Sequence, residues 1–327
     1  MKSTILKSLW GLGGTSTPCF ISGSPRSGTT WILEVLEKIA EARIHWEPLN
    51  WHLYNSAYDR STDPLNWMRP NEETLENHPE LAQELSRILK GGVPSKPAMM
   101  RIAHLSAIQN AVRLVSAKDT VVKFVFAQRA LSWMAKNTAG KGCVILRHPM
   151  SVVSSQYHHP YRPDGKWAQH PEWTDEVICA SHPMVSLLEA TQYSALERLM
   201  KIDLLPEGRL AITACLDMLA ALNSPEAKQK YAFVAYESLL GSPENFLKLA
   251  NFLDLRIKVQ PTVEELRKRS RTTSDQNKNS GTARLSCEAR DQIQMIIDEL
   301  GLGFYKQDGS LDHAALKALK LPNLISD

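Results

Sequence analysis

Short runs of apolar residues alternate with stretches of helical periodicity along most of the chain. The clearest apolar runs are PCFISGS at 18–24, TVVKFVF at 120–126, GCVILRH at 142–148 and KYAFVAYE at 230–237. We interpret each run as a buried strand. Because strands that alternate with helices favour a parallel sheet, the pattern predicts an α/β fold with a central parallel sheet flanked by helices.

Two helices follow predicted strands directly. After the first strand comes GTTWILEVLEKIAEA, in which Trp31, Val35 and Ile39 recur every four residues along one face. This spacing predicts an amphipathic helix that begins at a glycine-containing turn. After the third strand, MSVVSSQYHH predicts a short helix whose start is marked by Pro149.

Two irregular segments interrupt this rhythm. Residues 48–118 contain several aromatic residues and prolines, followed by an acidic helical stretch around 71–90. Residues 158–184 hold further aromatic residues. We interpret both as insertions over the top of the sheet rather than as separate domains.

The length and composition fit one large domain. The chain has 327 residues, 43% of them hydrophobic, which suffices for a sizeable core. No internal repeat or low-complexity linker divides it. We therefore predict a single domain over 1–327, with a core at about 18–255 and a C-terminal helical or lid region at about 260–327.

Charge and cysteine content exclude several classes of protein. With 38 basic and 35 acidic side chains the net charge is +3, which indicates no nucleic-acid partner. Five widely spaced cysteines contain no C-x-x-C pair, so neither a disulfide framework nor a zinc site is indicated. No signal peptide and no long uncharged apolar stretch is present, so we expect a cytoplasmic protein without a membrane segment.

The segment GSPRSGTT at 23–30 lies between a predicted strand and a predicted helix. Unpaired backbone N–H groups and the helix dipole make such a loop an anion site. Gly23 and Gly28 have the spacing of an ATP-binding loop, but Thr29 stands where lysine is expected, and the cation is Arg26. No predicted strand ends in the aspartate that holds Mg²⁺ in ATP chemistry, so we predict no metal. A phosphosulfate carries less charge than a triphosphate and needs only arginine, lysine and backbone donors.

Three segments together resemble the motifs of sulfotransferases that use 3′-phosphoadenosine 5′-phosphosulfate (PAPS). SPRSGTTW at 24–31 is similar to the phosphosulfate loop, in the arginine-containing form of tyrosylprotein and many bacterial members. Arg147, followed eight residues later by Ser155, matches the second motif, and the Tyr-Glu pair that opens 236–253 matches the third. The resemblance covers roughly 18–255 and implies a central sheet of the P-loop type, with the two irregular insertions on its substrate side.

The resemblance implies a set of donor-binding residues. The loop would bind the 5′-phosphosulfate, Arg147 and Ser155 the 3′-phosphate, and two aromatic residues the adenine, with Ser154 as an alternative to Ser155. A late basic run, 267–274, would contribute a lid, although a solvated loop is an equal interpretation; deletion of 265–280 tests the lid through PAPS affinity. The implied set is Arg26, Ser27, Gly28, Thr29, Thr30, Trp31, Arg147, Ser155, Tyr236, Arg267 and Lys268.

The resemblance also implies catalytic residues. Lys123 lies within the apolar run VVKFV, where a lysine needs a partner, and the family has a lysine there that contacts the sulfuryl group. Many cytosolic members carry a histidine base two residues later, but position 125 is valine. We therefore predict Glu47 as general base, as in the arginine-loop members, with Arg26 assisting Lys123.

Several histidines remain as alternatives to Glu47 or as parts of the acceptor site. His45, His52 and His104 are the fallback candidates for the base, and each is better explained as a packing or surface histidine. His158 and His159 are candidates for the mouth of the acceptor site, and a role at the end of the helix explains them equally well.

The predicted function is transfer of a sulfuryl group from PAPS to a hydroxyl or amine, with adenosine 3′,5′-bisphosphate (PAP) as product. A kinase of the P-loop type that uses ATP–Mg²⁺ is one alternative, and a nucleotide-binding module without activity is another. The sequence does not identify the acceptor as a small molecule or a polymer, and monomer and homodimer both stay open.

Overall fold

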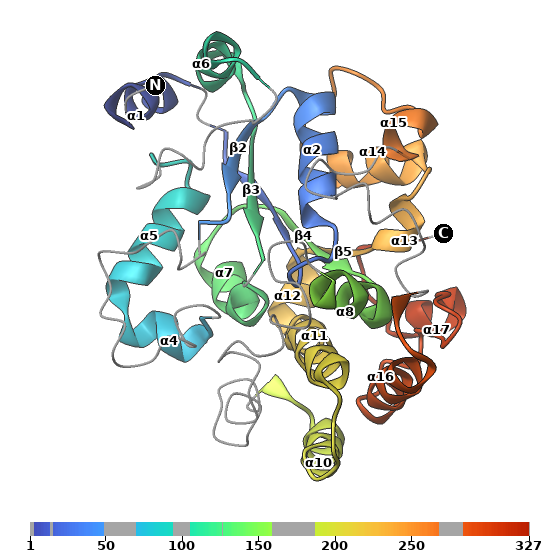
Figure 1. Ribbon diagram of the computed structural model, residues 1–327. Helices are drawn as coiled ribbons and strands as arrows, with labels where there is room; N and C mark the ends of the chain where they lie inside the picture. Colours follow the sequence, from blue (N-terminus) through green and yellow to red (C-terminus); the bar gives the residue numbers. More distant parts are fainter. Residues whose placement is uncertain are drawn as a thin grey trace.

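The computed structural model describes residues 3–13, 16–48, 70–93, 105–125, 127–158, 187–267 and 284–326. These residues form a six-stranded, all-parallel sheet in the order β2-β3-β1-β4-β5-β6 (Figure 1). The strands are β1 (Cys19–Ser22), β2 (Arg43–Trp46), β3 (Thr120–Phe124), β4 (Gly142–Leu146), β5 (Ala232–Ala235) and β6 (Leu324–Ile325). The predicted parallel α/β fold is confirmed.

Helices cover both faces of the sheet, which explains why its central strands are buried throughout. On one face, α2 (Thr29–Ala40) and α14 (Pro243–Phe252) pack on the odd-numbered side chains of β1 and β4. On the other face, α5 (Pro79–Leu89), α7 (Leu131–Asn137), α8 (Pro149–Tyr157), α11 (Pro206–Leu222) and α16 (Cys287–Glu299) form the larger apolar cluster. Figure 1 shows α2 and α14 on one side and α5 and α7 on the other.

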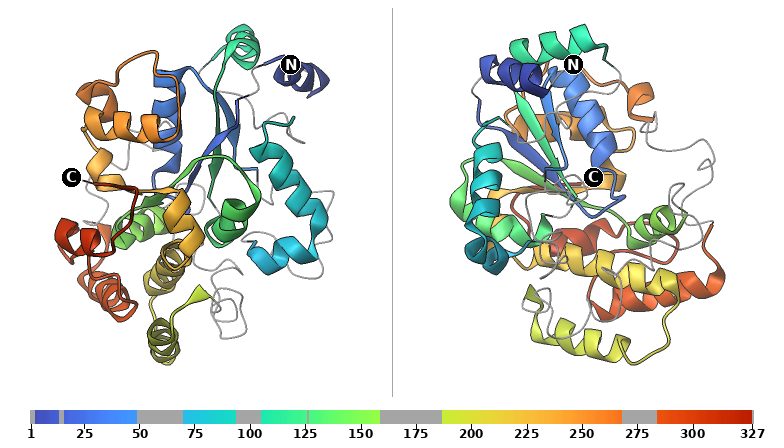
Figure 2. Two further views of the ribbon diagram at one scale, coloured as in Figure 1. Left: turned by 180° about the vertical axis from the view of Figure 1, so that it is seen from behind. Right: turned by 60° about the vertical axis from the view of Figure 1, so that its left-hand side comes forward.

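The remaining helices lie around these two layers (Figures 1 and 2). None of the helices in the described part of the chain is long and apolar enough to cross a membrane. These remaining helices are α1 (Ser3–Leu12), α4 (Glu72–Asn77), α6 (Ala107–Ser116), η3 (Gln128–Ala130), α10 (Ala190–Leu199), α12 (Pro225–Lys230), α13 (Tyr236–Leu239), α15 (Val263–Arg267) and α17 (His313–Ala318).

The predicted elements are found close to their expected positions. Each of the four predicted strands contains one observed strand, α2 follows β1, and α8 begins at Pro149. The acidic helical stretch at 71–90 forms α4 and α5. Most of the second expected insertion, 159–184, lies outside the described residues.

Strands β2 and β6 were not predicted. The sequence of β2 is RIHW, so its polar residues conceal it from a search for apolar runs. Arg43 and His45 are nevertheless buried, since Trp10 of α1 lies against both. Strand β6 has two residues and is set by its pairing with β5, to which the chain returns after α16 and α17 (Figure 2).

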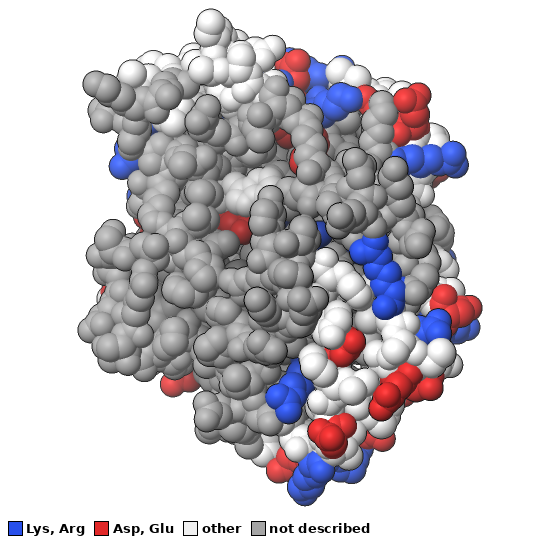
Figure 3. Space-filling view, viewed as in Figure 1, with Lys and Arg blue, Asp and Glu red and all other residues white. Residues whose placement is uncertain are grey.

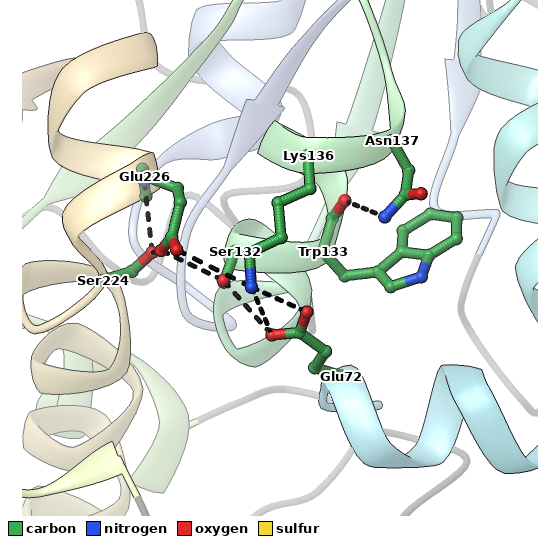
Figure 4. A network of polar contacts seen from close by, with 8 residues as sticks. Glu72, Ser132, Trp133, Lys136, Asn137, Ser224 and Glu226 are labelled. Carbon is green, nitrogen blue, oxygen red and sulfur yellow. Dashed lines mark hydrogen bonds and ion pairs between the residues drawn. The ribbon is translucent and has the colours of Figure 1, made fainter.

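A polar network attaches α4 to the core. Lys136 of α7 contacts Glu72 of α4 at 2.8 Å and Glu226 of α12 at 3.6 Å. The Ser132 hydroxyl donates to the same two carboxylates (Figure 4). On the face shown in Figure 3, described basic and acidic side chains are interspersed on the right-hand and lower right parts of the surface.

Candidate active site

The loop between β1 and α2 has the backbone of an anion site. The Ser27 N–H donates to the Ser24 carbonyl at 2.9 Å, and Gly28 is the N-cap of α2 with a φ of 96°. A Cβ atom at Gly28 would lie 2.2 Å from the Tyr236 ring, so only glycine fits here. Arg26 also has a positive φ, of 71°, an uncommon conformation for a residue other than glycine.

Hydrogen-bond donors at this loop are available to a ligand. The Ser27 hydroxyl makes no hydrogen bond to any residue that the structure describes, but it is buried, so the donors that face a ligand here are backbone N–H groups. Thr29 and Thr30 occupy the first turn of α2, and Gly28 offers no side chain to cap it. Unsatisfied N–H groups at the start of a twelve-residue helix favour a phosphate or sulfate group.

Arg147 follows β4 and lies over the aromatic ring that follows β5. Its guanidinium is 4.4 Å from the centre of the Tyr236 ring, and its Nη1 donates to the Arg26 carbonyl at 2.8 Å. Its Nε atom has no hydrogen-bond partner within the described part of the chain. That nitrogen is buried, but the residue is partly exposed and only Nη1 donates to a described residue, so the exposed part of the guanidinium is left for an external anion.

Arg26 joins the same cluster from the loop. Its Nε donates to the Ser155 hydroxyl of α8 at 3.0 Å. Burial, and secondarily the charge of Arg147, lowers the pKa of Arg26. Among the described residues, neither arginine has a carboxylate within ion-pair distance, so positive charge accumulates here. Ser155 contacts Arg26, whereas the neighbouring Ser154 is buried within α8 packing.

Trp31 lies behind Tyr236. Its ring packs edge-on against Tyr236 at 5.3 Å and against Phe246 at 5.2 Å, and only 5% of the residue is exposed. Because Tyr236 stands between Trp31 and Arg147, Trp31 acts first as a support for that ring.

Lys123 and Glu47 form a buried ion pair at the ends of β3 and β2. The Lys123 ammonium contacts the Glu47 carboxylate, and it also lies 3.9 Å from the centre of the Trp46 ring. The Glu47 N–H donates to the Lys123 carbonyl at 2.9 Å, which extends the sheet pairing by one residue. Burial lowers the pKa of Lys123, and the neighbouring carboxylate opposes this effect.

A family model of the sulfotransferase domain matches residues 16–295. The chain belongs to the sulfotransferase family. The matched segment begins just before β1 and ends inside α16, so it contains the phosphate loop, Arg147, Tyr236 and the Lys123–Glu47 pair. No curated protein and no solved structure matched the chain. The family inferred from the three sequence motifs is thus confirmed, and it identifies the chain as a transferase of sulfuryl groups.

Of the histidine alternatives, the structure describes His45 and His158. His45 is buried against Trp10, and neither ring nitrogen hydrogen-bonds to a described residue. Burial lowers the pKa of His45 to about 3. His158 contacts the Ser154 carbonyl at the end of α8. His52, His104 and His159 lie outside the described residues.

The expected lid of the sulfotransferase stays a prediction. Arg267 is the exposed last residue of α15, and its Nε would lie 3.9 Å from a Cβ placed at Gly241. Lys268 and the rest of the basic run to 274 lie outside the described residues.

Two residues at the donor side were not predicted. Gln156 of α8 donates to the Pro25 carbonyl at 2.9 Å and so holds the phosphate loop. Glu237 accepts a hydrogen bond from the His148 N–H at 3.0 Å. Both act on backbone groups that are distant in sequence. The Tyr-Glu pair was the sequence signal for Glu237, but it gave no role for the carboxylate.

Proposed function

We propose that the protein transfers a sulfuryl group from PAPS to an acceptor hydroxyl or amine and releases PAP. Family membership supports sulfuryl transfer, and one observation favours PAPS as donor. Arg26 and Arg147 meet at the phosphate loop without a carboxylate partner among the described residues. Because PAPS carries anionic groups at both the 5′ and 3′ positions, it suits two adjacent arginines.

The donor would bind across the carboxyl ends of β1, β4 and β5. The backbone of 27–30, with the Thr29 and Thr30 hydroxyls, would accept the 5′-phosphosulfate, since these groups form the first turn of α2. Arg147 and Ser155 would bind the 3′-phosphate. Tyr236 would contact the adenine, with Trp31 behind it.

In the proposed reaction the acceptor oxygen attacks the sulfur atom. A new S–O bond forms, the bond from sulfur to the bridging phosphate oxygen breaks, and the acceptor proton passes to Glu47. Lys123 and Arg26 would stabilise the charge that develops on the bridging oxygen of PAP. The Glu47–Lys123 ion pair supports this assignment, because it joins base and cation at one end of the sheet.

We further infer a cytoplasmic reaction. The described cysteines Cys19, Cys143, Cys215 and Cys287 are free thiols, which fits a reducing compartment. The acceptor, whether small molecule or polymer, and the choice between monomer and homodimer are left to experiment.

Calorimetric titration with PAP and with ATP–Mg²⁺ tests the donor. The wild-type protein should prefer PAP, and Arg147→Ala should weaken PAP binding by tenfold to hundredfold, on the order of 1.5–3 kcal/mol for a charged hydrogen bond. Preference for ATP–Mg²⁺ would reassign the loop to a kinase. Tight PAP binding without PAPS turnover on a panel of hydroxyl and amine acceptors would indicate a binding module.

A further inference from the structure

Two consecutive residues after β4 contact two consecutive residues after β5. The strands are parallel, and their last residues are paired in register. The Arg147 guanidinium lies over the Tyr236 ring, and the next residue along each chain repeats the contact, because the His148 N–H donates to Glu237 Oε1. The backbone of the Arg147–His148 dipeptide is therefore held from the β5 side.

The second oxygen of Glu237 has no evident structural partner. Glu237 Oε2 is buried and makes no hydrogen bond to any described residue. Burial raises the pKa of Glu237, while the His148 amide and the charge of Arg147 oppose that effect. Burying a carboxylate is costly, and the His148 N–H is the backbone donor from another element that holds Glu237 Oε1 in place.

A C-terminal hairpin holds His148 from the other side. His148 Nδ1 accepts a hydrogen bond from the Met150 N–H at 3.2 Å. The proton of the ring is therefore on Nε2, which donates to the Lys306 carbonyl of the hairpin at 2.8 Å. The ring also packs on Tyr305 at 4.9 Å between centres. This hairpin, closed by the bridge between Tyr305 and Leu311, lies beyond the residues matched by the family model.

We propose that Glu237 is a positioning residue for Arg147. The carboxylate fixes the backbone at His148, and the hairpin fixes the His148 side chain, so that Arg147 leaves the strand in one direction. The Arg147 side chain has only one hydrogen bond and one ring contact among the described residues, so its direction depends on the backbone of residues 147–148. Fixing a long side chain before the ligand arrives reduces the entropy lost on binding. The inference rests on the proposed function, in which Arg147 binds the 3′-phosphate.

The test separates the length of the side chain at position 237 from its charge. Glu237→Gln keeps an oxygen at the same distance but removes the charge, whereas Glu237→Asp keeps the charge but withdraws the oxygen by one methylene. The quantity measured is the ratio of the AMP to the PAP dissociation constant, which isolates the 3′-phosphate. Positioning predicts a ratio within about threefold of wild type for Glu237→Gln and a decrease of about tenfold for Glu237→Asp.

Two controls separate positioning from general damage. Glu37→Asp shortens another buried carboxylate, which pairs with Arg113 at 2.6 Å in the opposite part of α2, and should leave the ratio unchanged. In an Arg147→Ala background, Glu237→Asp should have no further effect on the ratio.

Distinct outcomes overturn the inference and the proposed function. If Glu237→Asp leaves the ratio unchanged, weakens AMP and PAP equally, or lowers the ratio as much without Arg147, Glu237 does not position Arg147. A larger loss in Glu237→Gln than in Glu237→Asp would make the charge the active property and would also overturn the inference. A wild-type protein that binds AMP as tightly as PAP would overturn the proposed function itself.

Discussion

Two arginines at opposite ends of the sheet have similar surroundings. Arg43 opens β2 and Arg147 follows β4, and each guanidinium lies 4.4 Å from the centre of an aromatic ring, Trp10 or Tyr236. Each also donates to a backbone carbonyl, Arg43 to Trp10 at 2.9 Å and Arg147 to Arg26 at 2.8 Å. Ring contact and carbonyl contact therefore do not separate a structural arginine from one that binds a ligand.

The remaining donors make the difference. Arg43 is 1% exposed, and its Nε donates to the Thr120 hydroxyl at 3.1 Å. Arg147 is partly exposed, and only its Nη1 donates to a described residue. An arginine whose donors are used within the protein stabilises the fold, whereas one with a spare donor has binding capacity for an anion.

The distribution of charge at the two ends agrees with this distinction. Near the amino ends of the strands, Arg113 pairs with Glu37, and Arg256 lies 3.9 Å from Asp119. At the carboxyl ends, Arg147 and Arg26 lie together, and their hydrogen bonds to described residues are accepted by neutral groups, the Arg26 carbonyl and the Ser155 hydroxyl. The excess of positive charge at the carboxyl ends suits a donor that carries anionic groups at two positions.

The largest expected effect tests the carboxyl end. Glu47→Gln preserves the shape beside Lys123 but removes the proton acceptor, so kcat for sulfuryl transfer should fall by about 10²–10⁴-fold. Steady-state turnover of PAPS with an acceptor found by the panel measures it. The PAP dissociation constant is the control and should change little. An undiminished kcat would assign the base to another residue.

The next effect tests the amino end. Arg43→Ala leaves the Trp10 carbonyl and the Thr120 hydroxyl buried without their donor and opens space beside the Trp10 ring. The free energy of unfolding should decrease by about 2–4 kcal/mol, while the PAP affinity of the folded protein stays the same. Urea unfolding and calorimetry measure the two quantities. A selective loss of PAP affinity would remove the distinction between the two arginines.

Much of the fold was predictable because its central strands are continuous apolar runs. Strands β1, β3, β4 and β5 are each buried along their whole length, so the sequence carries a local signal for them. Strand β2 places Arg43 and His45 against α1, and β6 is set by long-range pairing with β5. Neither has a local signal, because burial there depends on distant elements.

The candidate site divides in the same way. Arg26, Arg147, Ser155 and Tyr236 were identified from motifs, and the structure brings them into contact. The direct pairing of Lys123 with Glu47 was not predicted, since residues 76 positions apart carry no local mark of contact. Glu237 and Gln156 escaped for a related reason, as each acts on a backbone group of another element.

A third prediction concerns the stability of the protein at acidic pH, through His45 near the amino ends of the strands. His45 is neutral in the folded protein, since burial holds its pKa at about 3, and it titrates near 6.5 when unfolded. The unfolded chain therefore binds the additional proton as the pH falls below 6.5, and stability decreases by up to about 1.4 kcal/mol per pH unit. Above pH 6.5 this contribution to stability is fully present.

His45→Phe removes that titration and keeps a ring against Trp10. Urea unfolding of both proteins at pH 7.5, 6 and 5 should give free energies that differ by a constant above pH 6.5, and below it the wild type should lose stability relative to the variant. Parallel curves down to pH 5 would show that His45 gains a proton in the folded state.

The smallest expected effect concerns charges that lie outside both ends of the sheet. Lys136 contacts Glu72 and Glu226 and so joins α7 to α4 and α12, but these side chains are 46%, 36% and 38% exposed (Figure 4). Lys136→Met should therefore lower Tm by at most a few degrees, and the difference should shrink in high salt, because water and ions screen such pairs. Lys248→Met is the matched control, since its partner Glu244 lies in the same helix, and it should have a smaller effect. Equal decreases in Tm for the two variants would show that an exposed ion pair gains nothing from joining three helices. A loss of stability in Lys136→Met as large as that in Arg43→Ala would show that the exposed fraction of a cation does not separate stabilising from weak sites in this protein.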